Sequence, residues 1–322
     1  MWRSGIISLI VVALWACVAP AGQPEPTNAA DIAILSVDEP GEQTWDPAAH
    51  LAGSWTSVTL TSRLDRNSDV PARTLVVASS FTLTDPNGLL GMTRTPTAIL
   101  ALDQNASVVC STAAARDRFY TTPLSIKKMV AGKWVDELLP YTFSVNVPVD
   151  SARAYPLMLT KLQWSTYALV AGSVKNFDIP FKATTQWVEL VPGLQVLVEK
   201  ADVTGTSYQY TMKVKYNPSK VSMISGMTFL VGDQKPPEVI VSKVEVLDAQ
   251  GKSIQDQANG GGFGGGGSYT GTMTEMTGTS TGTGNCNICG TAATIRYTLS
   301  LNAYEKEIRF LLQNVPVPAV WY

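Results

Sequence analysis

The sequence predicts an all-β protein: two tandem antiparallel β-sandwich domains of immunoglobulin-like or fibronectin-like architecture that follow a signal peptide. Two observations predict this fold class. Apolar residues recur at every second position in many short stretches, as in half-buried strands, whereas the period of an amphipathic helix is nearly absent. Clusters of Asp, Asn, Pro and Gly separate these stretches and are typical of the turns in a sandwich.

The start of the chain indicates export. Residues 1–21 combine a charged start, an apolar run over 6–16 that is too short to span a bilayer, and the Ala-x-Ala form of a cleavage site. Residues 14–17 instead resemble a bacterial lipobox that would leave Cys17 lipidated, although Trp15 departs from that pattern. We therefore expect an extracytoplasmic protein (periplasmic, cell-surface or secreted) that touches a membrane only through such an anchor.

The composition limits the chemistry that the chain can perform. Hydrophobic residues make up 45% of the sequence, charged residues 16%, and the formal net charge is −2. A chain so poor in charge offers no basic surface to nucleic acid. Residues 251–253 read Gly-Lys-Ser, the end of a phosphate loop, but Val246 stands where that loop needs its first glycine, so we expect no nucleotide site.

The strands follow from the alternation. In residues 208–216, Tyr and other apolar residues alternate with polar ones, so one face of this strand should be buried and the other exposed to water. Short helices are expected only near residues 127–139 and 150–155. The other predicted strands lie at residues 81–83, 143–147, 194–198 and 295–301.

The predicted domain boundary lies near residue 184, where a fresh strand begins. Residues 80–88 and 243–251 share an alternating strand followed by Asp-x-x-Gly, which is either the trace of a duplication or a common turn device. The expected organisation is a Pro-rich tether over residues 22–30, a first sandwich over 30–184, a second over 185–318 and a tail over 319–322.

The second domain contains the one low-complexity stretch. Residues 259–290 are rich in Gly, Thr and Ser and hold too little apolar surface to offset the entropy of ordering, so they predict a mobile loop. Such a loop is either functional or a tolerated insertion. Phe263 and Tyr269 within it, with Trp321 and Tyr322 in the tail, are candidate contacts to a partner.

Two cysteines form the sharpest local motif, because Cys286 and Cys289 are separated by two residues. A redox dithiol would need a helix N-terminus, and a zinc site would need two further ligands where only Cys110 and His50 remain. We expect a local Cys286–Cys289 disulfide, with redox and metal roles as alternatives, and a buried thiol at Cys110.

Other constellations point to no catalysis. Asp65, Asn67 and Asp69 supply alternating oxygen ligands as calcium loops do, but Val70 stands where such a loop needs glycine, so a polar loop is the simpler interpretation. His50 is the only histidine, and the chain has no Gly-x-Ser-x-Gly motif. We expect no catalytic residue and no cofactor.

These observations favour an exported, non-enzymatic bacterial envelope protein with a structural, adhesive or assembly role through protein–protein contacts of its β-sandwich domains. The partner would be an envelope protein or a polysaccharide. The alternative is a carbohydrate-binding protein that stacks sugars on two or three coplanar exposed aromatic rings, whereas a structural module should bury nearly all of its tryptophans. The tryptophans considered for stacking are Trp45, Trp55, Trp134, Trp164 and Trp187.

Overall fold

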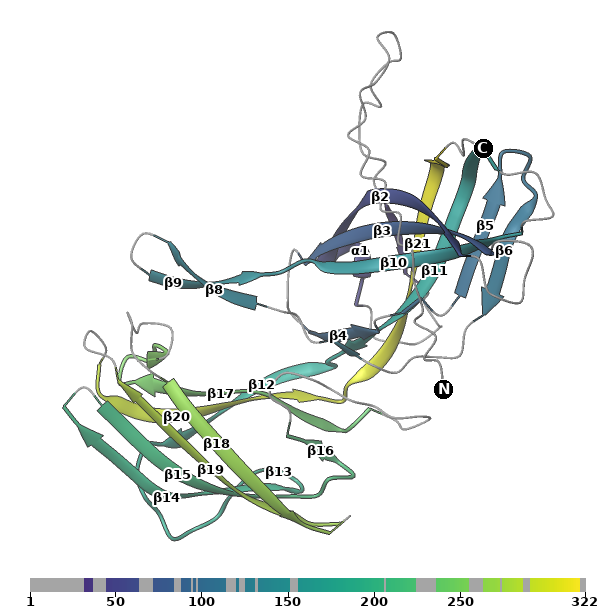
Figure 1. Cartoon of the computed structure of the whole chain (residues 1–322). Helices are drawn as coiled ribbons and strands as arrows, with labels where there is room; N and C mark the ends of the chain where they lie inside the picture. Colours follow the sequence, from purple (N-terminus) through teal and green to yellow (C-terminus); the bar gives the residue numbers. More distant parts are fainter. Residues whose placement is uncertain are drawn as a thin grey trace, which may run out of the picture.

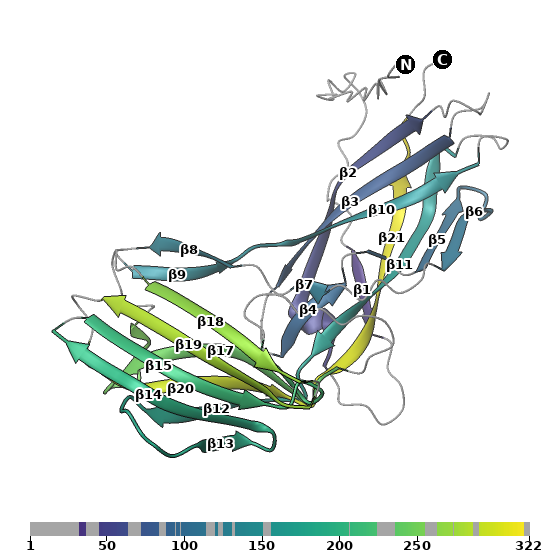
Figure 2. The same ribbon diagram turned by 60° about the horizontal axis from the view of Figure 1, so that its bottom comes forward.

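The computed structural model confirms an almost entirely β chain of antiparallel sheets (Figures 1 and 2). All strands except one two-stranded hairpin gather in two bodies, here called lobe 1 and lobe 2, each with its own hydrophobic core. The structure describes residues 32–36, 45–63, 72–83, 88–93, 95–96, 98–113, 120–121, 125–130, 133–150, 156–205, 207–223, 236–254, 263–272, 274–285 and 290–318.

Lobe 1 has two sheets. One has the strand order β10–β3–β2; the other has the order β1–β21–β11–β4–β7, with β5 also paired to β11 and β6 to β5. The bounds are β1 (Ala33–Ser36), β2 (Leu51–Arg63), β3 (Ala72–Leu83), β4 (Leu89–Thr93), β5 (Ala98–Asp103), β6 (Val108–Ala113), β7 (Tyr120–Thr121), β10 (Tyr141–Val149), β11 (Met158–Val170) and β21 (Tyr304–Pro316).

Aromatic rings from both sheets form the centre of the lobe 1 core. Trp164 of β11 stacks on Phe310 of β21 with ring centroids 5.3 Å apart. Phe81 of β3 lies 4.5 Å from Phe310 and meets Phe143 of β10 edge-on at 5.5 Å. Because Phe81, Trp164 and Phe310 are all buried, these contacts join the two sheets of the lobe.

Lobe 2 also has two sheets, with a core between them formed by side chains of both. The four-stranded sheet has the order β12–β20–β17–β16, and the five-stranded sheet has the order β13–β14–β15–β19–β18. The bounds are β12 (Ser173–Pro180), β13 (Val188–Val191), β14 (Leu194–Thr204), β15 (Ser207–Tyr216), β16 (Val221–Ser222), β17 (Val239–Asp248), β18 (Phe263–Gly271), β19 (Met276–Asn285) and β20 (Ala292–Leu301).

A single antiparallel ribbon runs through both lobes. In lobe 1, β11 pairs with β21 as far as Val170 opposite Tyr304, and in lobe 2, β12 pairs with β20 from Ser173 opposite Leu301. The register is the same on both sides of the joint, so two neighbouring chain segments cross it together (Figure 2). Lobe 2 is therefore inserted between two strands of lobe 1.

This grouping differs from the predicted division at residue 184. The prediction placed β12 in the first domain and β21 in the second, whereas β12 belongs to a sheet of lobe 2 and β21 lies between β1 and β11 in lobe 1. The physical reason is that alternation shows which face of a strand is buried but not which sheet the strand joins.

The joint between the lobes is itself packed. Leu169 of β11 and Ile240 of β17 are both buried there, with Ala303 packed against them. Two backbone bonds secure the crossing: Ala171 N donates to Gly88 O at 2.7 Å, and Asn302 N donates to Glu238 O at 2.8 Å. These contacts tie the ribbon to both lobes where it passes from one to the other.

Local sequence explains the short elements. The helix α1 (Pro47–His50) begins after Asp46, whose carboxylate accepts a hydrogen bond from Ala48 N at 3.0 Å, and proline occupies its first position. The helix expected at 127–139 is wrong, because β8 (Ser125–Val130) and β9 (Lys133–Leu138) form a separate two-stranded hairpin there. None of the helices in the described segments is long and apolar enough to cross a bilayer.

Turn chemistry was predicted more successfully. At the Gly-Lys-Ser stretch, the Asp248 carboxylate accepts bonds from Gln250 N and Lys252 N, both at 2.9 Å, and Gly251 has φ +77°. This is a tight turn after β17, in which glycine supplies the left-handed conformation.

One exposed ion pair links β12 to β20 and makes stability depend on pH. Arg296 donates to both Asp178 oxygens at 2.7 Å, and this hydrogen bonding lowers the pKa of the Asp178 carboxyl. A lowered folded-state pKa contributes stability above the ordinary Asp pKa of about 3.9, and that contribution is lost as pH falls through the folded value.

We expect Asp178→Asn to cost no more than about 1 kcal/mol at pH 7, because the pair is partly exposed to solvent. Urea unfolding of both proteins from pH 7 to pH 3 checks this, and the difference should shrink below about pH 4. A difference that grows on acidification would contradict the assigned ion pair.

Candidate functional site

The Gly- and Thr-rich stretch is the part of lobe 2 that departs most from expectation. The mobile loop predicted over residues 259–290 is wrong wherever the structure describes that stretch in strands, because β18 and β19 both lie within it. They pair in one unbroken register from Phe263 opposite Gly284 to Gly271 opposite Met276. Pairing with the rest of a sheet offsets the entropy that a glycine-rich segment loses on ordering.

The glycines of β19 make room for large rings. Gly282 lies opposite Tyr210 and Gly284 opposite Tyr208, and a Cβ atom at either glycine would overlap the facing ring. The two tyrosine rings are parallel, and Phe181 meets them edge-on at 5.9 and 6.2 Å. Glycine here is a packing requirement of the five-stranded sheet.

Strand β18 forms the outer margin of that sheet (Figures 1 and 2). It pairs with β19 and, among the strands that the structure describes, with no other. It is 9 residues long, carries no charged residue and no proline, and has no bulge. An edge of this kind presents unpaired backbone groups to which another strand can add.

The other described edges are guarded. Proteins shield exposed edges with short strands, bulges, prolines or charges. The edge strands β1, β7, β13 and β16 have at most four residues. The longer ones carry a guard: Pro148 in β10, Lys175 and Pro180 in β12, a bulge between Trp55 and Ser57 in β2, and a bulge between Val108 and Cys110 in β6. Both strands of the β8–β9 hairpin carry charged residues. Among the edges that the structure describes, β18 is therefore the one long strand without a guard.

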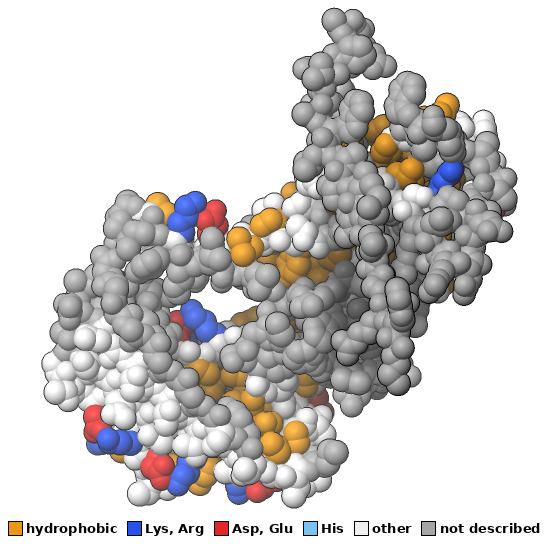
Figure 3. Space-filling model, in the orientation of Figure 1, with side chains coloured by type: hydrophobic (Ala, Val, Ile, Leu, Met, Phe, Trp, Pro, Cys, Tyr) orange, Lys and Arg blue, Asp and Glu red, His pale blue; other side chains and the backbone are white. Residues whose placement is uncertain are grey.

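The outer face of the five-stranded sheet is polar. Thr277, Thr279, Thr281 and Thr283 occupy alternate positions of β19, with Gly278, Gly282 and Gly284 buried between them. On this part of lobe 2, charged side chains of opposite sign lie next to each other, as red beside blue in Figure 3. These ion pairs are Lys213–Glu199 at 2.6 Å, Lys215–Glu275 at 3.4 Å and Lys200–Asp202 at 2.9 Å.

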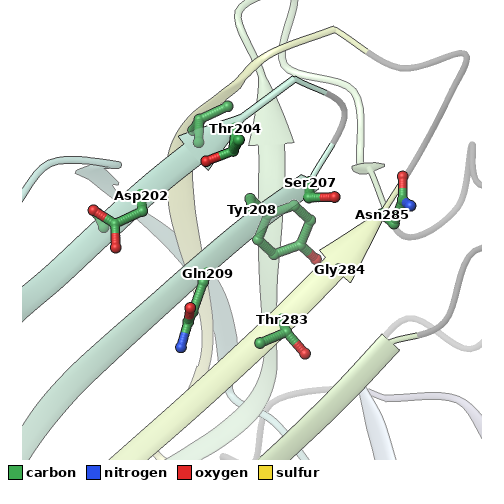
Figure 4. Close-up of a pocket in the computed structure, with 10 residues that line it drawn as sticks. Asp202, Thr204, Ser207, Tyr208, Gln209, Thr283, Gly284 and Asn285 are labelled. Atoms are coloured by element: carbon green, nitrogen blue, oxygen red, sulfur yellow. The ribbon is translucent and has the colours of Figure 1, made fainter.

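A shallow polar groove of about 670 Å³ lies at the end of this sheet, where β14, β15 and β19 meet. Figure 4 shows side chains from these three strands around it. They supply hydroxyl, amide and carboxylate groups suited to hydrogen bonding with a polar ligand. The polar lining residues are Asp202, Thr204, Ser207, Gln209, Thr283 and Asn285.

Most of the predicted site residues fall where the structure says nothing of them. Phe263 and Tyr269 lie on β18, opposite Gly284 and Gly278 of β19. The lipidation, calcium, disulfide and tail candidates lie outside the described residues: Cys17, Asp65, Asn67, Asp69, Cys286, Cys289, Trp321 and Tyr322. The predicted disulfide thus stays a prediction.

The tryptophans with described side chains form no coplanar exposed platform. Trp45 and Trp164 are buried, Trp55 is half-buried, and Trp187 is 39% exposed just before β13. Trp134 lies on β9. The stacking surface that the carbohydrate hypothesis requires is thus missing from the tryptophan side chains described.

The single histidine of the sequence and the cysteine that the structure describes both lie in lobe 1. The His50 ring is parallel to Trp45, with centroids 5.2 Å apart. Cys110 is buried as predicted, and burial raises the pKa of its thiol. In the part of the chain that the structure describes, no three His, Cys, Asp or Glu side chains gather to hold a metal ion.

No protein-family model matches the chain, and comparisons with curated proteins and with solved structures give no significant match.

Sequence reasoning missed the free edge and the threonine face. The alternation of Thr with Gly or Ser over residues 277–284 has the same two-residue period as the neighbouring apolar strands. Because these residues are not apolar, a search for hydrophobic alternation passes over them.

Proposed function

We propose that the protein is an exported, non-enzymatic bacterial envelope protein whose role is assembly or adhesion through contacts of its β-sheets. The observation that carries the proposal is the long, uncharged and unguarded edge of β18. Strand addition at such an edge gives affinity through backbone hydrogen bonds and needs no cofactor. The two lobes are proposed to be sandwiches of immunoglobulin-like or fibronectin-like type, with the second inserted into the first.

The ribbon that joins the lobes supports an assembly role in which the molecule transmits mechanical force. Because β11–β12 and β20–β21 pair in one register across the joint, a force on lobe 2 passes into the core of lobe 1 through two hydrogen-bonded strands. A single flexible linker would transmit no fixed orientation. A molecule that assembles with others benefits from this rigidity.

Edge substitutions test the proposal in the native envelope. Ser268→Lys places a charge on β18, which is the way natural edges are guarded, and Thr277→Lys places the same charge on the outer face one strand inward. After chemical cross-linking and affinity capture, we expect the wild type and Thr277→Lys to retain an envelope protein that Ser268→Lys loses.

Equal capture by all three proteins would refute a role for the β18 edge.

The second candidate function is carbohydrate binding, favoured by the polar groove beside Gln209 and Thr283. Recovery only with envelope polysaccharide, released by soluble sugar, would overturn the first proposal and support this second one.

A further inference from the structure

In the five-stranded sheet, aromatic residues of β15 and of β18 lie opposite glycines of the strand between them, β19. Within the five-stranded sheet, four aromatic residues lie directly opposite glycines of β19. On the β15 side these pairs are Tyr208–Gly284 and Tyr210–Gly282, and on the β18 side they are Phe263–Gly284 and Tyr269–Gly278. A ring placed opposite a glycine can lie over the neighbouring strand without a clash, as Tyr208 and Tyr210 do.

Two copies of β18 could place aromatic residues opposite glycines in the same way if their free edges paired. If two copies of β18 run antiparallel with Gly267 opposite Gly267, Tyr269 lies opposite Gly265 of the second copy and Phe263 lies opposite Gly271. This register uses the whole strand. It also keeps the residues that share a face in each copy on the same face of the joined sheet, because their spacing is even.

We propose that the protein forms a two-fold symmetric dimer in which the β18 edges of two copies pair around Gly267 and join their five-stranded sheets into one. This rests on the proposed function, since it names a second copy of the chain as the partner of the edge. A strand paired with itself antiparallel is the simplest closed symmetry, and it leaves neither β18 edge open for further growth.

Charge does not oppose this contact. Strand β18 carries no charged residue, and the ion pair nearest to it in the strand order joins Lys215 of β15 to Glu275. Two copies can therefore approach edge to edge without like charges directly opposite each other, which would destabilise a strand pair.

A cysteine at the centre of the contact tests its register. Directly opposite residues of antiparallel strands have Cα atoms about 4.5–5.5 Å apart, which is within disulfide range. In the full exported chain with Cys286 and Cys289 replaced by Ser, Gly267→Cys should give a disulfide-linked dimer under mild oxidation. The matched control Thr270→Cys should not, since the two cysteines would lie about 20 Å apart along the strands.

Solution measurements test the dimer independently of that variant. Sedimentation over a concentration series should show a wild-type dimer whose dissociation constant rises at least roughly tenfold in Ser268→Lys but not in Thr277→Lys. A monomer at every concentration, a dimer indifferent to Ser268→Lys, or equal cross-linking at 267 and 270 would each overturn the proposal.

These outcomes separate the dimer from the broader function. A monomeric protein that loses its envelope partner in Ser268→Lys would overturn self-pairing and leave the assembly role supported. A monomeric protein whose envelope partners are indifferent to Ser268→Lys would overturn both.

Discussion

Truncation after Ala303 is expected to unfold lobe 1 and leave lobe 2 folded. The deleted strand β21 lies between β1 and β11, and its side chains Ile308, Phe310 and Leu312 are fully buried. Each such side chain contributes about 1.5–3 kcal/mol by burial, so the loss approaches the total stability of a typical domain, about 5–15 kcal/mol. Trp164 would also lose its stacking partner.

The fragment that contains lobe 2 alone, residues 173–301, is expected to fold by itself. Its two terminal strands, β12 and β20, pair with each other, and it contains every residue of the lobe 2 core cluster. Circular dichroism and urea unfolding should show one cooperative transition for this fragment.

The fragments suggested by the predicted boundary provide the control. Residues 30–184 lack β21, and residues 185–318 lack β12, so neither should unfold cooperatively. A cooperative transition in the fragment 30–184 would mean that β21 is dispensable to lobe 1, contrary to its buried position.

The contrast between these fragments shows where sequence reasoning stops. Alternation over residues 208–216 correctly predicted β15, with Tyr208, Tyr210, Met212 and Val214 buried. Residues 304–316 form a strand whose buried and less buried residues alternate in the same way over much of its length. Whether that strand closes lobe 1 or lobe 2 depends on pairing with a segment some 140 residues away, which no local pattern encodes.

The prediction of a mobile loop in the glycine-rich stretch was wrong for a different reason. Composition measures what a segment can bury by itself, and residues 263–271 can bury little. What orders β19 is supplied by Tyr208 and Tyr210 on the neighbouring strand, whose rings occupy the space that side chains at Gly282 and Gly284 would take. The candidate site at the β18 edge follows from that pairing, so it became recognisable only with the sheet order.

Gly282→Val is expected to destabilise lobe 2 by about 1–3 kcal/mol, the usual cost of overpacking a core. Valine is intrinsically favoured in strands, so the sign depends on the facing ring. The Tyr210 ring is buried, parallel to Tyr208 and edge-on to Phe181, and it cannot move aside without giving up these contacts.

Three further variants decide whether that ring is the cause: Thr281→Val, Tyr210→Val and the double variant of Tyr210 and Gly282. Thr281→Val, one position along on the exposed face of β19, should change the stability by less than about 0.5 kcal/mol. In a Tyr210→Val background, Gly282→Val should cost clearly less than in the wild type, because the space above the glycine is then free. Urea unfolding of the four proteins in this double-mutant cycle measures the coupling. If Gly282→Val proved no worse than Thr281→Val, Tyr210 could not lie over the glycine, and the packing that positions the β18 edge would have to be different.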